Sequence, residues 1–236
     1  MLPLMSRARS VKTDSFTVLR EAFAAAGARH ILDLGCGTGE LAARLSEAGF
    51  AVTGVDPQAA ALERARQLAP AVQFLLSRVE DLPADCGPFD AACFVNALHH
   101  VAPDRMEAAL IKALSLVRPG GEVLVIEPLA LGSFFRCMRP VDDESEIRAQ
   151  AIAALEAVIA SGRAKLRDLK RWDRETLFDG LDGFVDYLLA VDPDRRPLIE
   201  AHGSDLARAW RDNIALRDGK AVLVQPIICW VLTAGA

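Results

Sequence analysis

The chain has 236 residues, of which 52% are hydrophobic and 25% carry a charge, so it is long enough to bury the core of one globular domain. Its net charge is -5 and it has no basic stripe, which argues against a nucleic-acid-binding protein. No apolar run approaches the ~18 residues of a membrane-spanning helix, and the N-terminus lacks the apolar core of a signal peptide, so we expect a cytoplasmic protein with no membrane partner.

Helical and strand patterns alternate along the first half of the chain. Apolar residues at three- and four-residue steps predict helices, and short runs rich in apolar residues predict strands. In chain order we expect a helix at 14–26, a strand at 31–34, a helix at 40–47, a strand at 51–55, a helix at 58–68, strands at 72–76 and 90–95, a helix at 104–117 and a strand at 122–126. Strands that alternate with helices in this way predict an α/β fold with a doubly wound, mainly parallel sheet.

The first predicted strand ends in a glycine-rich turn. Residues 30–40 read HILDLGCGTGE, which places Gly35, Gly37 and Gly39 between the strand and the next helix. Such a turn lets the backbone approach a nucleoside cofactor, because glycine tolerates positive φ and has no Cβ atom. A dinucleotide-binding turn would need its third glycine at position 40, where the chain has Glu40. Together with Asp33, this carboxylate disfavours a pyrophosphate and favours a ligand with a cationic amino group.

The second predicted strand ends in Asp56, which is followed by Pro57. In a doubly wound sheet, an acidic residue at this place accepts hydrogen bonds from ribose hydroxyl groups. Pro57 suits the first turn of a helix, because its missing N–H group would be unpaired there in any case. The alternative is that Asp56 serves only as the N-cap of that helix.

Three later segments add further motifs in a characteristic order. VEDLP (79–83) follows the third strand, FDAACFVNALHHV (89–101) contains the fourth, and LVRPGGEVLVIEP (116–128) contains the fifth. Together with the glycine turn, these segments resemble the class I S-adenosylmethionine-dependent methyltransferases over residues 14–128. The resemblance implies S-adenosyl-L-methionine as the cofactor and S-adenosyl-L-homocysteine as its product.

The resemblance also implies a role for each matching position. Asp33 and the carbonyl group of Gly35 would face the amino group of the methionine part, and Asp56 would bind the ribose. Where the family often has a carboxylate that binds adenine, this chain has Arg78, which cannot accept a hydrogen bond, so backbone groups or Glu80 would recognise adenine instead. The implied cofactor-binding residues are Asp33, Gly35, Cys36, Gly37, Gly39, Asp56, Pro57, Val79, Glu80 and Asn96.

Two histidines and a glutamate are the candidate catalytic bases. His99 and His100 follow the fourth strand, where a histidine could remove a proton from an acceptor near neutral pH, and Glu127 ends the fifth strand. The alternatives are structural: a histidine that packs or caps, and a glutamate that hydrogen-bonds the neighbouring loop. Asn96 has no acidic neighbours and the five cysteines lack metal-binding spacing, so we expect no metal ion.

The segment 129–213 carries helical patterns at 147–160 and 198–211, which predict a mostly helical cap inserted after the fifth strand on the substrate side. Half of the aromatic residues of the chain lie in this segment. They would form either a pocket for an apolar or aromatic acceptor or an ordinary core. Arg136 and Arg139 would either receive an acidic group of the acceptor or lie on the surface.

Residues 214–236 fit the last strands of the sheet, with a hairpin turn at Asp218 and Gly219. We therefore expect a single domain over residues 1–236, with the cofactor-binding core at 14–128, the insertion at 129–213 and the C-terminal strands at 214–236.

These features predict an enzyme that transfers a methyl group from S-adenosylmethionine to an oxygen or nitrogen atom of a small molecule. One alternative is a protein of the same fold that uses S-adenosylmethionine for a rearrangement, a decarboxylation or cofactor remodelling. Another is a protein that binds S-adenosylmethionine without catalysis. A nicotinamide-dependent dehydrogenase is disfavoured, because Glu40 stands in place of the third glycine.

Overall fold

The computed structural model describes residues 8–10 and 13–235 of the chain. Residues 1–7, in which the sequence predicts no signal peptide, lie outside this range. The described residues form two compact units. Unit 1 comprises the described residues up to Glu127, the segment Gln150–Arg171 and the described residues from Ile228, and unit 2 comprises Pro128–Ala149 and Trp172–Ile227.

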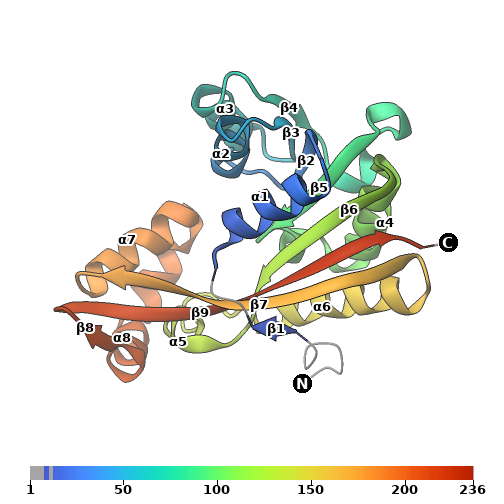
Figure 1. Ribbon diagram of the computed structural model, residues 1–236. Coiled ribbons are helices and arrows are strands. Elements are labelled where there is room, and N and C mark those ends of the chain that lie inside the picture. The colour runs from blue at the N-terminus through green and yellow to red at the C-terminus, as the bar shows by residue number, and fades with distance from the viewer. Residues whose placement is uncertain (1–7, 11–12, 236) are drawn as a thin grey trace. The chain divides into compact units, whose positions relative to one another are not determined.

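The strands of unit 1 form a mainly parallel sheet (Figure 1). The order is β1-β7-β9-β6-β5-β2-β3-β4, in which β7 and β9 take part with the portions that belong to unit 1. All strand pairs among β2, β3, β4, β5 and β6 are parallel, as the sequence predicts. The bounds are β1 (Arg9–Ser10), β2 (His30–Leu34), β3 (Ala51–Asp56), β4 (Gln73–Leu76), β5 (Phe89–Val95), β6 (Val117–Pro128), β7 (Ala164–Phe178), β8 (Ala215–Arg217) and β9 (Lys220–Ala234).

The helices of the first half of the chain lie within a few residues of their predicted bounds. The helices are α1 (Ser15–Ala25), α2 (Glu40–Glu47), α3 (Ala59–Leu68), α4 (Met106–Leu116), α5 (Gly132–Met138), α6 (Ser145–Ala160), α7 (Leu181–Val191) and α8 (Arg196–Asn213). In unit 1, α2 packs on β3, α3 on β3 and β4, and α4 on β5. Within the described part of the chain, no helix combines the length and apolar character needed to cross a membrane.

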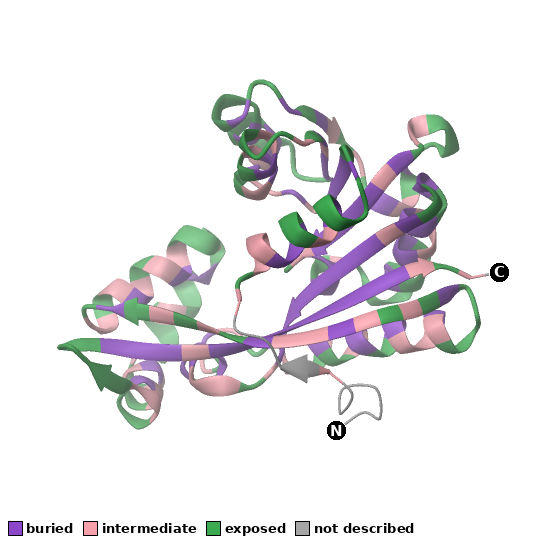
Figure 2. Ribbon diagram, viewed as in Figure 1, coloured by how far each residue is buried: buried purple, intermediate pink, exposed green. Residues whose placement is uncertain are grey.

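The middle of the sheet is the core of unit 1. Strands β2, β5 and β6 are buried along most of their length (Figure 2), as expected of parallel strands that have a neighbour on each side. The pairing brings Leu34 opposite Val55 and Phe94, and Val95 opposite Ile126. The carboxyl ends of β2, β3, β5 and β6 therefore meet at one edge of the sheet, which is where ligands bind in open α/β folds.

The prediction for residues 129–213 needs a correction. Helices α6 and α8 lie where the sequence predicts them, but α5 and α7 were not predicted, and residues Ala164–Phe178 form the long strand β7 rather than part of a helical cap. Charged residues alternate with half-buried ones along this strand. Because many of its residues are charged, the two-residue period of a strand is not apparent from the sequence, which resembles an exposed charged surface.

The end of the chain follows the prediction. Strands β8 and β9 pair in antiparallel fashion, with Arg217 opposite Lys220. Between them, Asp218 and Gly219 both have positive φ, at 52° and 77°. This is the backbone conformation of a tight hairpin turn, so the hairpin at this dipeptide is confirmed.

Candidate functional site

The glycine turn joins β2 to α2 through a backbone that favours glycine. Gly35, Gly37 and Gly39 have φ values of 72°, 52° and 81°. A Cβ atom on Gly35 would come within 2.6 Å of the Cβ atom of Ala97, which belongs to the loop after β5. The turn and that loop therefore touch at the sheet edge where the strands end, and no larger residue fits at position 35 without a shift.

Asp33 lies beneath this turn and is only 1% exposed. Its Oδ1 atom accepts a weak hydrogen bond from the thiol of Cys93 at 3.8 Å. Its Oδ2 atom is buried and has no hydrogen-bond partner among the described residues. Burial raises the pKa of this carboxyl group to about 7, the Cys93 thiol opposes that rise, and the charge of Asp56 adds to it. A carboxylate oxygen left without a donor at the end of a parallel strand fits a ligand that brings an N–H group.

Asp56 ends β3 and connects two backbone segments. Its Oδ2 atom accepts a hydrogen bond from the N–H group of Gly37 at 2.9 Å, and its Oδ1 atom accepts one from Gln58 at 2.8 Å. The N-cap of α3 is Gln58, and the side chain of Asp56 accepts the N–H group of that residue, so Asp56 supports the start of α3 from outside the helix. The exposed Pro57 lies between them. Each carboxylate oxygen can accept a second hydrogen bond, so Asp56 remains able to bind hydroxyl groups.

The loop after β4 contains the positions expected to bind adenine. Val79 is buried and begins a short 3-10 helix, Val79–Asp81, while Arg78 is exposed. Glu80 is ion-paired with Arg105, whose Nη1 atom lies 3.3 Å from the Oε1 atom of Glu80. Arg105 is not predictable from the sequence, because it lies 25 positions from Glu80 and no local pattern links the two.

Glu127 holds the loop that follows β5. It is 2% exposed, and its Oε1 atom accepts hydrogen bonds from the N–H groups of Ala97 at 3.2 Å and Leu98 at 2.8 Å. Its Oε2 atom forms a short contact with the Nδ1 atom of His99, which is also buried. Glu127 therefore makes the hydrogen bonds to the neighbouring loop that the sequence analysis named as its structural alternative.

Two exposed residues complete this loop. Asn96 has a φ of 51°, which is unusual for a residue other than glycine, and its N–H group donates to the carbonyl oxygen of Ile126 at 2.8 Å. The ring of the exposed His100 lies 4.1 Å, centroid to centroid, from the ring of His99. The loop is thus fixed from below by Glu127 and presents Asn96 and His100 to solvent.

The cysteines and acidic residues form no metal site in the described part of the chain, where no group of three potential ligands comes together. Cys36 is a buried free thiol in the glycine turn, and burial raises its pKa far above the ordinary value. Its N–H group donates to the carbonyl oxygen of Val55 at 3.0 Å. Cys36 therefore takes part in the turn through its backbone, and its thiol is not activated.

The aromatic residues of unit 2 pack against one another. Phe134, Phe178, Phe184 and Trp210 are buried in one cluster, with ring centroids 5.3 to 6.1 Å apart in the contacting pairs. These residues form the core of unit 2. Two arginines considered as receivers of an acidic group have partners of their own: Arg136 donates to Asn213, and Arg139 is ion-paired with Asp143; both are exposed.

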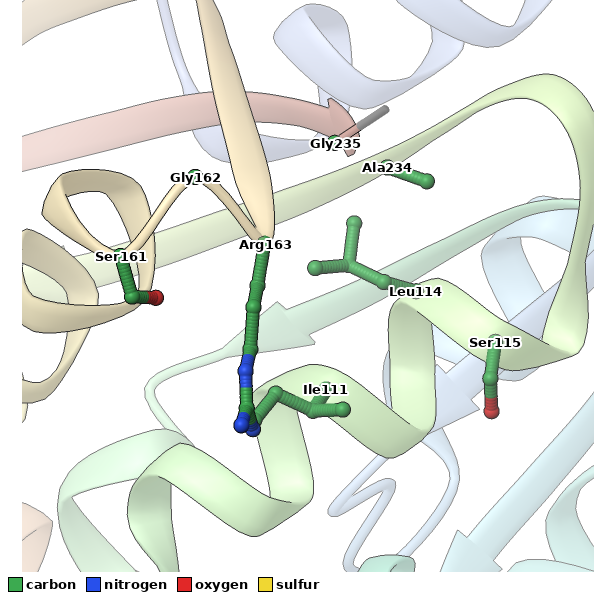
Figure 3. Close-up of a pocket in the computed structure, with 8 residues that line it drawn as sticks. All are labelled: Ile111, Leu114, Ser115, Ser161, Gly162, Arg163, Ala234 and Gly235. Atoms are coloured by element: carbon green, nitrogen blue, oxygen red, sulfur yellow. The ribbon is translucent and has the colours of Figure 1, made fainter.

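A hollow of about 390 Å³ lies elsewhere in unit 1 (Figure 3). It is formed by the end of α4, the turn between α6 and β7, and the end of β9, and the side chain of Arg163 extends toward Ile111. None of the site residues expected from the sequence lines this hollow. It therefore does not mark the site at the edge of the sheet.

Comparisons with known proteins point the same way as this geometry. Residues 31–121 match the family model described as a methyltransferase domain. An uncharacterized methyltransferase of Mycobacterium tuberculosis is 40% identical over 98 residues, which are 42% of this chain and 39% of that protein. The malonyl-[acyl-carrier protein] O-methyltransferase of Serratia marcescens is 32% identical over 161 residues, which are 65% of this chain and 62% of that protein.

A solved structure extends the likeness to the whole fold. The YcgJ protein of Bacillus subtilis matches with a TM-score of 0.66 and 20% identity, over 94% of this chain and 99% of that one. The sequence matches are more restricted, because the chain spans less than two thirds of the length of these curated relatives.

Proposed function

Because the chain belongs to the class I S-adenosylmethionine-dependent methyltransferases, we propose that it transfers a methyl group from S-adenosylmethionine to an oxygen or nitrogen atom of a small molecule. The observation that carries the proposal is the Oδ2 atom of Asp33, which is buried without a hydrogen-bond donor directly beneath the glycine turn. A cationic amino group supplies both the missing donor and the opposite charge, which a pyrophosphate would not.

The cofactor side of the proposal assigns each residue a contact. The Oδ2 atom of Asp33 accepts a hydrogen bond from the amino group of the methionine part, and the free lone pairs of Asp56 accept from the ribose hydroxyl groups. Glu80, oriented by Arg105, faces adenine. The remaining contacts come from the backbone or from apolar surface, at Gly35, Cys36, Gly37, Gly39, Pro57, Val79 and Asn96.

S-adenosylmethionine, when bound, supplies a methyl group already activated on a positively charged sulfur. The protein has to align the acceptor and, for a hydroxyl or ammonium acceptor, to take up one proton as the new bond to carbon forms and the bond from carbon to sulfur breaks. We assign proton removal to His99. Glu127 holds the Nδ1 atom of this ring, which leaves Nε2 to receive the proton.

His100 is the second candidate base, because its ring is exposed beside that of His99. Glu127 has both oxygen atoms occupied, so it acts in this proposal as a positioning residue for His99 and for the loop. An oxygen acceptor is supported by the relative from Serratia marcescens, which is named as an O-methyltransferase.

The experiment that tests the proposal measures S-adenosylhomocysteine formed during incubation with S-adenosylmethionine and a panel of phenols, carboxylic acids and amines. We expect product that depends on the acceptor and is formed in equal amount with methylated acceptor. His99→Gln should lower kcat by about 10²- to 10⁴-fold, as for loss of a general base, with unchanged S-adenosylmethionine binding. His100→Gln is the comparison variant at the second candidate base, and we expect it to keep its kcat.

Two results would contradict this account. Consumption of S-adenosylmethionine without S-adenosylhomocysteine would point to the other chemistries of the same fold, such as a rearrangement or a decarboxylation. An unchanged kcat in His99→Gln together with a lowered kcat in His100→Gln would identify His100 as the base.

A further inference from the structure

Unit 2 contains one half-buried positive charge that nothing in the described chain neutralises. Among the described residues of unit 2, three arginines are not fully exposed: Arg148, Arg174 and Arg195. Arg148 is paired with Glu144, and Arg195 with Asp142. The side chain of Arg174 forms no hydrogen bond or ion pair with any described residue, and its Nε atom is buried without a partner.

The strand pattern places Arg174 on the inward face of β7. Trp172 and Phe178 on the same face are buried, whereas Asp173 and Glu175, on the opposite face, are exposed. Glu175 is paired with Arg217. The acidic neighbours along the strand therefore point away from the guanidinium group, and the charge of Arg174 lies over apolar surface.

That apolar surface is aromatic. The Cζ atom of Arg174 lies 5.7 Å from the ring centroid of Phe134, within range of a cation–π contact. The ring of Phe134 contacts that of the half-buried Tyr187 edge-on at a centroid distance of 5.7 Å. Only the Nε atom of the guanidinium group is both buried and unpaired, so its two outer nitrogen atoms are open to solvent.

We propose that Arg174 binds the carboxylate of an apolar or aromatic carboxylic acid. A planar guanidinium group matches the two oxygen atoms of a carboxylate, and its outer nitrogen atoms donate to them in parallel. The half-buried side chain of Tyr187 then offers apolar contact to the rest of the ligand.

The test measures binding of matched acids and amides by calorimetry at pH 7.5. The probes are benzoate with benzamide, phenylacetate with phenylacetamide, and hexanoate with hexanamide, titrated into the full-length protein with and without saturating S-adenosylhomocysteine. We expect at least one acid to bind ten-fold or more tightly than its amide. Arg174→Gln should abolish this preference, and Arg174→Lys, which keeps the charge but not the fork, should retain part of it.

Arg211→Gln is the matched control, because Arg211 of the same unit is exposed; it should leave the preference unchanged. The proposal is overturned if no acid binds, if acids and amides bind alike, or if the preference survives in Arg174→Gln. The proposal is also overturned if the one effect of Arg174→Gln is self-association of the protein. That result would mean that the inward-facing charge serves to keep the edge of the strand from pairing with another chain. Binding of S-adenosylhomocysteine is read separately, so its absence would count against the proposed function and not against the carboxylate site.

Discussion

Asp33 is the residue whose environment departs furthest from that of an ordinary carboxylate. Its pKa is raised from 3.8 to about 7, mainly because burial penalises the charged form. In the unfolded chain the group ionises near pH 4, so between pH 4 and pH 7 the folded protein holds a proton that the unfolded chain has lost. Stability contributed by the neutral group is therefore complete below about pH 4 and is lost as the pH rises toward 7.

This argument predicts a pH-dependent effect of Asp33→Asn. The substitution removes the ionisation, so the free energy of unfolding of the variant relative to wild type should rise between pH 4 and pH 8, by up to about 4 kcal/mol for a shift of this size. Urea unfolding of both proteins across that range measures the difference. A constant difference would show that Asp33 ionises normally in the folded protein.

Among the elements, the glycine turn makes the sharpest steric prediction. Gly35→Ala should destabilise the protein by about 2–4 kcal/mol, because the residue has positive φ and the added methyl group would overlap the side chain of Ala97. Gly37→Ala is the matched control, since its φ is also positive but a Cβ atom there meets nothing within 4 Å. Chemical denaturation should give a smaller loss for the control, and Ala97→Gly should restore part of the loss in Gly35→Ala. Equal losses of stability in Gly35→Ala and Gly37→Ala would show that the close approach to Ala97 does not determine the effect.

The loop after β5 depends on a single side chain. Glu127→Ala leaves two buried N–H groups and His99 without their acceptor, so we expect a loss of about 3–5 kcal/mol. Glu127→Gln keeps an acceptor for the two N–H groups and should lose less. Thermal and urea unfolding compare the two variants. If Glu127→Ala and Glu127→Gln lower the free energy of unfolding equally, the hydrogen bonds to the two backbone N–H groups do not account for the stabilisation by Glu127.

The same elements show what local sequence can and cannot predict. Strands β2, β3 and β5 and helix α2 were predicted closely, because apolar runs and glycine stops are local signals. The pairing of Glu127 with His99 and with the loop joins residues 28 to 30 positions apart, and only the sheet brings them together. Strand β7 was missed because charged residues occupy the positions that would carry an alternating apolar pattern.

At the scale of the whole molecule, the segment 14–127 of the predicted cofactor-binding core lies in unit 1, and its binding of the cofactor stays a prediction. The compact units cut across the segment that was expected to form one insertion. Residues 129–213 were expected to form one insertion, whereas most of α6 and the first half of β7 belong to unit 1 and the remainder to unit 2. Compact units depend on contacts between segments that are distant in sequence, so local composition does not predict their limits. The unpaired charge of Arg174 could not be found from sequence for the same reason.

The central claim is that the edge of the sheet at Asp33 and the glycine turn binds S-adenosylmethionine. The most direct test is isothermal titration of the protein at pH 7.5 with S-adenosylmethionine, S-adenosylhomocysteine and NAD in parallel, each repeated with Asp33→Asn. The account predicts that both adenosyl-sulfur ligands bind, that NAD does not, and that Asp33→Asn weakens the first two by about ten-fold or more, as for loss of a charge-assisted hydrogen bond. Folded protein that binds neither adenosyl-sulfur ligand, or that binds NAD instead, would contradict it.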